Sequence, residues 1–148
     1  TLSPTLGVVP LSGHRTFVVA DIPGIIEGAH AGRGLGIQFL RHIERTRVLA
    51  FLIPIDAMDY QAEYDQLRRE VREYSQELAD KPHCVVFTKL DLLGEEYVPE
   101  LDAPGSFGSF AVSAAAREGL DAVLQAWWSQ LLALRKATAR QSADAALP

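Results

Sequence analysis

Residues 83–91 read HCVVFTKLD, a run of apolar and β-branched side chains that passes directly into a polar tetrapeptide. Short apolar runs of this kind are typical of strands that are buried on both faces of a sheet. We therefore predict a strand over 83–87 and a loop over 88–94. The polar residues of the loop would then lie at the carboxyl end of the strand, where open α/β sheets bind their ligands.

Further strands are predicted on both sides of this segment. Residues 15–20 (RTFVVA) and 47–55 (RVLAFLIPI) are apolar and rich in β-branched side chains. Pro54 has no N–H to donate to a sheet, so we expect it where the chain leaves the strand. A fourth strand is expected near 109–112, after a turn over 103–108 that contains Gly and Pro.

Helical periodicity separates the strands. Apolar residues recur every three or four positions over 37–46, 60–78 and 117–136, and a short helix is expected near 95–101. Asp59 is the expected N-cap of the second of these helices. Strands that alternate with helices of this length predict an α/β fold, built from right-handed βαβ units around a mostly parallel sheet.

Composition limits the class of protein. The chain has 148 residues, of which 48% are hydrophobic and 22% charged, and its net charge is −5. We expect one domain over 1–136 and, because periodicity is lost, a disordered tail over 137–148. Lys and Arg form no cluster longer than a pair, so no nucleic-acid patch is expected in this segment. One cysteine, no signal-peptide pattern and no long apolar run favour a cytoplasmic protein without a membrane span.

The loop after residues 15–20 carries groups that suit a metal and a phosphate. The tetrapeptide Asp21-Ile22-Pro23-Gly24 places a carboxylate at a strand end, where it could hold a hydrated Mg²⁺. Its glycine lets a backbone N–H approach a terminal phosphate closely. Taken alone, the tetrapeptide is equally consistent with an ordinary turn.

The loops after the strands predicted over 83–87 and near 109–112 offer groups that fit a guanine base. In Thr88-Lys89-Leu90-Asp91, the aspartate could accept both N–H groups on one edge of guanine, while the lysine stem lies along the base. In Ser113-Ala114-Ala115, small side chains would let a backbone N–H reach the base carbonyl oxygen. In isolation these residues are also compatible with a solvated lysine, a capping aspartate and a common strand end.

The order of the three motifs is more specific than any one of them. Asp-x-x-Gly, then [Asn/Thr]-Lys-x-Asp, then Ser-Ala, each at a strand end, is the sequence plan of regulatory GTPases. The stretch that begins at Asp21, DIPGIIEGAHAGRGLGIQFLRHIERTRVL, closely resembles the Obg (CgtA) family of bacterial GTPases. The opening TLSPTLGVV is similar to that family's first switch region. The resemblance covers residues 1–136.

The resemblance implies a three-layer G domain of the P-loop GTPase type. It also implies that the parent protein binds GTP and GDP with Mg²⁺, hydrolyses GTP, and acts at the ribosome in assembly of the large subunit. Thr1 and Asp21 would coordinate the Mg²⁺. The nucleotide-binding residues that the match implies come from two switch regions, a guanine-reading loop and a base-carbonyl loop: Thr1, Leu2, Asp21, Ile22, Pro23, Gly24, Thr88, Lys89, Leu90, Asp91, Ser113, Ala114 and Ala115.

Two features depart from the family pattern, whereas Ile25 matches the apolar residue of the Obg family and differs only from other GTPases. Ile25 stands where GTPases that orient the attacking water with a side chain often carry glutamine, so we expect slow hydrolysis and assign no catalytic residue. Thr88 replaces the commoner asparagine, which in the family bridges to the phosphate loop. No Gly-x-x-x-x-Gly-Lys-[Ser/Thr] motif is present, so the backbone cradle and lysine of a phosphate loop are missing.

Two hypotheses follow from the missing phosphate loop. The first is a fragment of an Obg-type G domain that lacks its first strand, phosphate loop and first helix, because the chain opens inside the first switch. In the family fold the missing strand lies between 15–20 and 47–55, and its removal would leave a gap of about 10 Å, so these strands would either pair directly or leave the fragment only marginally stable. The alternative is a non-catalytic remnant or interaction module that does not bind nucleotide.

The remaining candidate residues favour structural roles. The histidines show no metal-ligand spacing, and each is expected at the surface or in a loop: His14, His30, His42 and His83. Cys84 lies near the start of a predicted buried strand, so we expect it to pack in the core.

Overall fold

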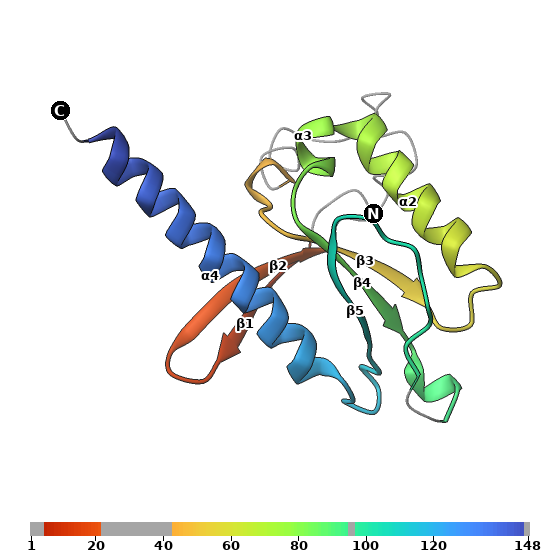
Figure 1. The fold of residues 1–148 in the computed structure, drawn as a ribbon. Helices are drawn as coiled ribbons and strands as arrows, with labels where there is room; N and C mark the ends of the chain where they lie inside the picture. The colour runs from red at the N-terminus through yellow and green to blue at the C-terminus, as the bar shows by residue number, and fades with distance from the viewer. Residues whose placement is uncertain (1–4, 22–42, 95–96, 147–148) are drawn as a thin grey trace. The chain divides into compact units, whose positions relative to one another are not determined.

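The computed structural model describes residues 5–21, 43–94 and 97–146. Its elements, in chain order, are β1 (Thr5–Leu11), β2 (Arg15–Asp21), β3 (Leu49–Pro54), α2 (Tyr60–Tyr74), α3 (Gln76–Ala79), β4 (His83–Thr88), the 3-10 turn η2 (Leu90–Leu92), β5 (Ser106–Ala111) and α4 (Leu120–Ala145) (Figure 1). They fall into two compact units, one of residues 1–46 and 65–80 and one of residues 47–64 and 81–148, and each is described by itself. No helix in the described ranges is both long enough and apolar enough to cross a membrane.

The second unit is built on a parallel sheet with the strand order β3-β4-β5. Leu49 pairs with His83, and Pro54 pairs with Thr88 at the other end of β3. The central strand is β4, in which residues 83–87 are all buried. The predicted α/β class and the parallel pairing of these strands are therefore confirmed, and Pro54 lies at the end of its strand as expected.

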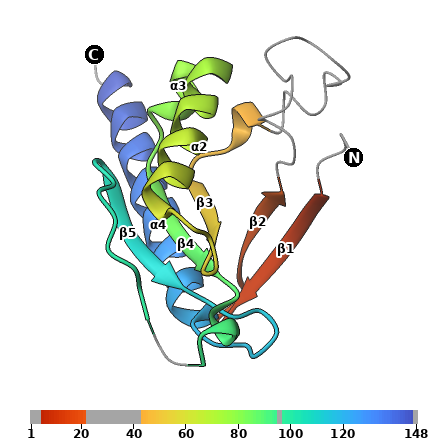
Figure 2. The ribbon, with the colours of Figure 1, turned by 90° about the vertical axis from the view of Figure 1, so that its right-hand side faces the viewer.

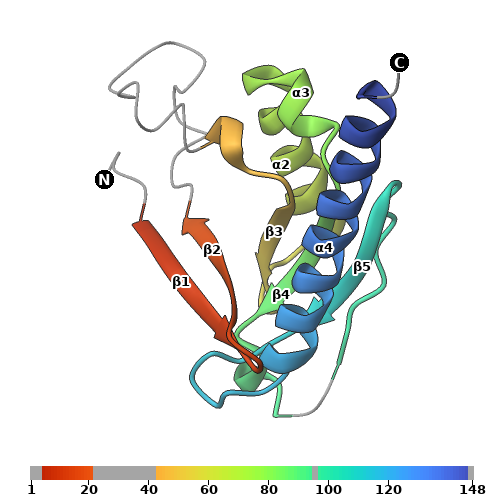
Figure 3. The same ribbon diagram turned by 90° about the vertical axis from the view of Figure 1, so that its left-hand side faces the viewer.

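Side chains of β4 alternate between two faces of this sheet. On one face Cys84 and Val86 form a buried cluster with Val112 and with Val123 of α4. On the other face Phe87 meets Tyr60 of α2, with ring centroids 5.3 Å apart. Figure 3 shows α4 running in front of the sheet, and Figure 2, drawn from the opposite side, shows it behind. Helices on both faces explain why the strand is a continuous apolar run.

The helix predicted over 60–78 begins as expected but is interrupted. Asp59 is its N-cap, because the Asp59 Oδ1 accepts a hydrogen bond of 3.0 Å from the Ala62 N–H. Ser75 breaks it: its backbone is extended (φ −160°, ψ 120°), and its side chain accepts the Leu78 N–H and starts α3. A local serine cap therefore overrides an apolar periodicity that continues through it.

The segment before β5 differs from the prediction. Residues 97–101, expected to be helical, form no regular element, and the turn η2 lies earlier in the chain. The Gln61 amide bonds to both backbone groups of Asp102, accepting its N–H at 3.0 Å and donating to its carbonyl at 2.9 Å. These bonds hold the backbone in an open conformation in place of a helix.

β5 then begins at Ser106, inside the predicted turn, because Phe107 and Phe110 pack against the core cluster.

The last helix is longer than predicted. α4 begins at Leu120 and continues to Ala145, so residues 137–145, expected to be disordered, are helical. The apolar stripe ends before this segment, but the segment is rich in alanine, which has the highest intrinsic helix propensity. Propensity therefore continues the helix where packing does not.

The first unit contains an antiparallel ribbon. β1 and β2 pair over their whole length, with Val8 opposite Val18, so the strand predicted over 15–20 is confirmed and a partner strand that was not predicted precedes it. β2 and β3 belong to separate sheets, so the direct pairing of these strands that we considered is not formed. Of the helix expected over 37–46, residues 43–45 are helical, Thr46 is not, and residues 37–42 lie outside the described residues.

Two residues at the start of β4 are buried. His83, expected at the surface, is only 2% exposed, and its Nε2 lies 2.7 Å from the Tyr64 hydroxyl. The prediction for His83 was wrong because its partner is 19 residues earlier in the chain and on a different element. Cys84 is fully buried, as predicted, and its sulfur accepts a hydrogen bond of 3.2 Å from the Trp127 indole N–H.

Cys84 gives a testable pH dependence. Burial raises the pKa of its thiol from 9.0 to about 11, and the Trp127 hydrogen bond offsets part of this rise. Above pH 9 the unfolded thiol loses its proton while the folded thiol keeps it, so the free energy of unfolding should fall as the pH rises from 9 towards 11. Urea unfolding at about pH 8 and about pH 10 should show a larger loss for the wild type than for Cys84→Ala. Equal losses in the two proteins would contradict this assignment.

Candidate functional site

The tetrapeptide Thr88 to Asp91 lies at the carboxyl end of the central strand. Thr88 ends β4, and its carbonyl accepts the Ile55 N–H at 2.9 Å, which ties the end of β3 to the same edge. Lys89 turns the chain through a left-handed conformation (φ 62°, ψ 37°), and its side chain is exposed. Leu90 is buried, and its N–H donates to the Val112 carbonyl at 3.0 Å. The tetrapeptide is therefore anchored to the chain that continues from β5.

Asp91 and Ser113 are brought together from two loops that lie 22 residues apart in the sequence. The Ser113 hydroxyl donates to Oδ1 of Asp91 at 2.7 Å and accepts the Ala116 N–H at 3.0 Å. Ser113 is fully buried, whereas Asp91 is exposed. A buried hydroxyl thus fixes the orientation of a carboxylate that faces solvent, and a preoriented carboxylate can accept two neighbouring N–H groups from a planar ligand.

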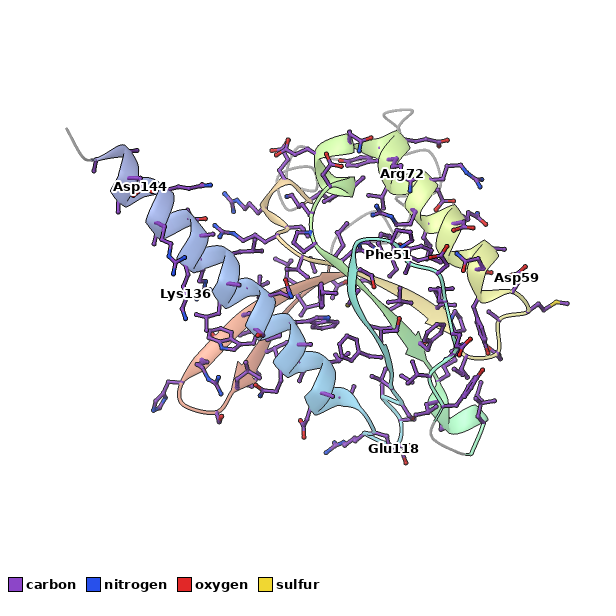
Figure 4. The ribbon with its side chains drawn as sticks, viewed as in Figure 1. Phe51, Asp59, Arg72, Glu118, Lys136 and Asp144 are labelled. Atoms are coloured by element: carbon purple, nitrogen blue, oxygen red, sulfur yellow. The ribbon has the colours of Figure 1, made fainter. Side chains whose placement is uncertain are left out.

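The loop that contains Ala114 and Ala115 is closed by its own backbone. Ser113 and Glu118 exchange two N–H to carbonyl hydrogen bonds, each of 3.0 Å. Ala114 and Ala115 lie inside this closed loop and are exposed. Their methyl side chains are too small to cover the backbone N–H groups. Figure 4 labels Glu118 at the end of the loop, next to the N-terminus of α4. The loop therefore presents backbone to solvent beside the Asp91 carboxylate.

One residue of this site was missed by the sequence analysis. Gly119 follows the closed loop, precedes α4, and has a left-handed backbone (φ 73°). The expected helix began at 117, which placed Gly119 inside a helix and hid its role. A glycine directly before a helical apolar stripe was the available signal, because glycine is common where the chain must adopt a positive φ.

The predicted phosphate and metal residues are described only in part. Asp21 is the last residue of β2, pairs with Thr5 and is exposed. The other predicted residues of the switch regions lie outside the described residues: Thr1, Leu2, Ile22, Pro23 and Gly24. Mg²⁺ binds through one or two carboxylates together with waters and phosphate oxygens, so a single exposed aspartate at a strand end fits such an ion. Within the described ranges, no group of three or more His, Cys, Asp or Glu side chains could hold a metal.

Comparison with known proteins gives one matching family and a set of relatives. The family described as 50S ribosome-binding GTPase matches residues 1–89. The chain is 48% identical over 141 residues to the GTPase Obg of Chlorobium chlorochromatii, covering 95% of this chain and 41% of that protein. It is 48% identical over 132 residues to the GTPase Obg of Chlorobaculum parvum (88% and 39% covered) and 45% identical over 133 residues to that of Porphyromonas gingivalis (88% and 34%). The chain thus spans about two fifths of the length of the curated relatives it matches.

Proposed function

This chain belongs to the family of 50S ribosome-binding GTPases, and on that premise we propose that it forms the guanine-reading part of an Obg-type GTPase. The observation that carries the proposal is the hydrogen bond of 2.7 Å by which buried Ser113 orients the exposed Asp91 carboxylate. We call the full-length product of the gene the intact protein, and the activity proposed below is that of the intact protein.

Recognition of guanine follows from the donors and acceptors on its edge. Guanine presents N1–H and the 2-amino group side by side, and an ionised carboxylate at Asp91 accepts both. Adenine presents an acceptor nitrogen in place of N1–H, so it would meet the carboxylate with a lone pair. The backbone N–H groups of Ala114 and Ala115 add a second test, because they suit the guanine carbonyl oxygen and repel the adenine amino group. A site built on such bonds rejects the wrong base by about 10⁴-fold.

We place the phosphate half of the site on residues 1–2 and 21–24, which supply the two switch regions. Thr1 and Asp21 would hold Mg²⁺, and the Gly24 N–H would contact the terminal phosphate. When bound, Mg²⁺ neutralises charge that develops on the phosphate oxygens during transfer to water. Ile25 has an apolar side chain that cannot form a hydrogen bond with the attacking water, and this supports slow intrinsic hydrolysis.

The family description supports a role at the ribosome. We propose that the intact protein acts in the cytoplasm, in assembly of the large ribosomal subunit. Switch loops that are ordered by the terminal phosphate and released after hydrolysis would report the nucleotide state to that partner.

Hydrolysis by the intact protein tests this proposal. We expect phosphate release from GTP with Mg²⁺, none above background from ATP at the same concentration, and loss of release after chelation. Asp21→Asn should lower GTP hydrolysis at saturating nucleotide by about 10-fold or more, because a neutral amide binds Mg²⁺ weakly. Asp144→Asn, an exposed acid near the end of α4, serves as the control and should hydrolyse GTP normally. Equal hydrolysis of GTP and ATP would overturn the proposal.

A further inference from the structure

We infer that Gly119 is a positioning residue of the guanine site, since it lets the loop 113–118 close onto Asp91. The inference rests on the function proposed above. Gly119 has φ 73°, and a Cβ placed there would overlap the carbonyl oxygen of Ala111, with the Ala111 carbonyl carbon at 3.3 Å and the Val112 Cα at 3.4 Å. Any other residue would therefore be both strained and in collision with the end of β5.

The backbone that the Cβ would meet cannot easily move away. Val112 donates its N–H to the Phe87 carbonyl at 2.8 Å and accepts the Leu90 N–H at 3.0 Å. Both bonds tie the end of β5 to β4 and to the guanine-reading tetrapeptide, in a buried part of the sheet. A side chain at position 119 would therefore displace its own backbone and leave Ala111 and Val112 in place.

Displacement of residue 119 is transmitted to Asp91 through two further contacts. Glu118 precedes Gly119 in the chain and is joined to Ser113 by both of its backbone hydrogen bonds. Ser113 in turn donates to the Asp91 carboxylate. If residue 119 moves outward, the pair of backbone bonds opens, the Ser113 hydroxyl loses the Ala116 N–H that it accepts, and it becomes free to turn away from Asp91. The carboxylate then loses the contact that orients it toward the guanine edge.

Gly105 provides a matched control within the same sheet. It also has a positive φ (80°), but the nearest atom to its Cβ would be Cε1 of His83 at 4.0 Å, an ordinary contact. It directly precedes β5, at the opposite end of that strand from the guanine-reading loops. Gly105→Ala therefore introduces the same kind of backbone strain without a collision and without touching the site.

The test measures GDP and IDP affinities of the intact protein in three forms: wild type, Gly119→Ala and Gly105→Ala. IDP lacks the 2-amino group that Asp91 reads, so the wild type should prefer GDP by about 10-fold or more. Gly119→Ala should weaken GDP binding by about 10-fold or more and bring the GDP-to-IDP preference close to one. Gly105→Ala should retain the wild-type preference even where urea unfolding shows a loss of stability.

Two outcomes overturn the inference: an unchanged GDP-to-IDP preference in Gly119→Ala, or an equal collapse in Gly105→Ala. If the wild type itself does not bind GDP, the proposed function fails, and only the closure of loop 113–118 onto Asp91 remains to be tested. Should Gly119→Ala not fold, amide hydrogen exchange of the wild type replaces it. The closed loop predicts that the Ser113 and Glu118 amides exchange slowly, and exchange at the rate of an open turn would contradict the inference.

Discussion

Asp91→Asn is expected to weaken GDP binding by the intact protein by about 100-fold or more, and to give it affinity for XDP. The carboxylate accepts two N–H groups from guanine through charge-assisted bonds, whereas an amide accepts one and turns its own NH₂ toward the other. Xanthine carries a carbonyl oxygen where guanine carries the 2-amino group, so it complements the amide. The asparagine oxygen still accepts the Ser113 hydroxyl, so the loop geometry should survive the change.

Titration calorimetry with GDP and XDP checks this prediction. Asp102→Asn is the matched control, because Asp102 is another exposed acid beside the same sheet and its backbone groups are the ones that Gln61 holds. It should bind GDP as the wild type does. If Asp91→Asn keeps wild-type affinity for GDP, the assignment of Asp91 to the guanine edge is wrong.

The 148-residue chain alone should hydrolyse GTP no faster than background. Its sequence contains no Gly-x-x-x-x-Gly-Lys-[Ser/Thr] motif, so it has no backbone cradle or lysine for the β- and γ-phosphates. Contacts to phosphates supply most of the nucleotide affinity in such domains. Loops that contact only the base are therefore expected to bind the nucleotide weakly. Single-turnover phosphate release, with the chain in excess over GTP, measures the effect.

The intact protein, assayed in parallel, provides the reference rate. Intrinsic rates of unassisted GTPases of this general type are on the order of 10⁻⁴ per second, so the assay must run for hours. Turnover by the 148-residue chain that matches the intact protein would show that the phosphate loop is dispensable, and would contradict this prediction.

The sequence predicts the central sheet because its strands are apolar runs, although only β4 is buried on both faces and Leu52 of β3 is 56% exposed. The segments 47–55 and 83–87 are continuous apolar runs, and both are strands of the parallel sheet. Features that depend on a distant partner or a single cap are not visible in such patterns. The hydroxyl that satisfies His83 comes from another element, and Ser75 stops a helix whose apolar periodicity continues past it.

The sequence also predicted the guanine-binding loops of the site, but not the glycine that positions them. The order of the motifs at strand ends placed Asp91 and Ser113 at one edge of the sheet, and they are joined there by a hydrogen bond. The resemblance to the Obg family, seen in the stretch after Asp21, is confirmed by the relatives. Gly119 needed coordinates, because its role depends on the distance between α4 and the end of β5. The phosphate and Mg²⁺ roles of Thr1 and Asp21 stay predictions.

Competition between nucleotides for the intact protein tests the central claim most directly. A fluorescent guanine nucleotide is bound first, and unlabelled GDP or ADP is then titrated against it with Mg²⁺ present. The arrangement of Asp91 and the Ala114–Ala115 backbone predicts that GDP displaces the label at concentrations about 10⁴-fold below those of ADP. Displacement by ADP at the same concentrations as GDP would show that this site does not read guanine.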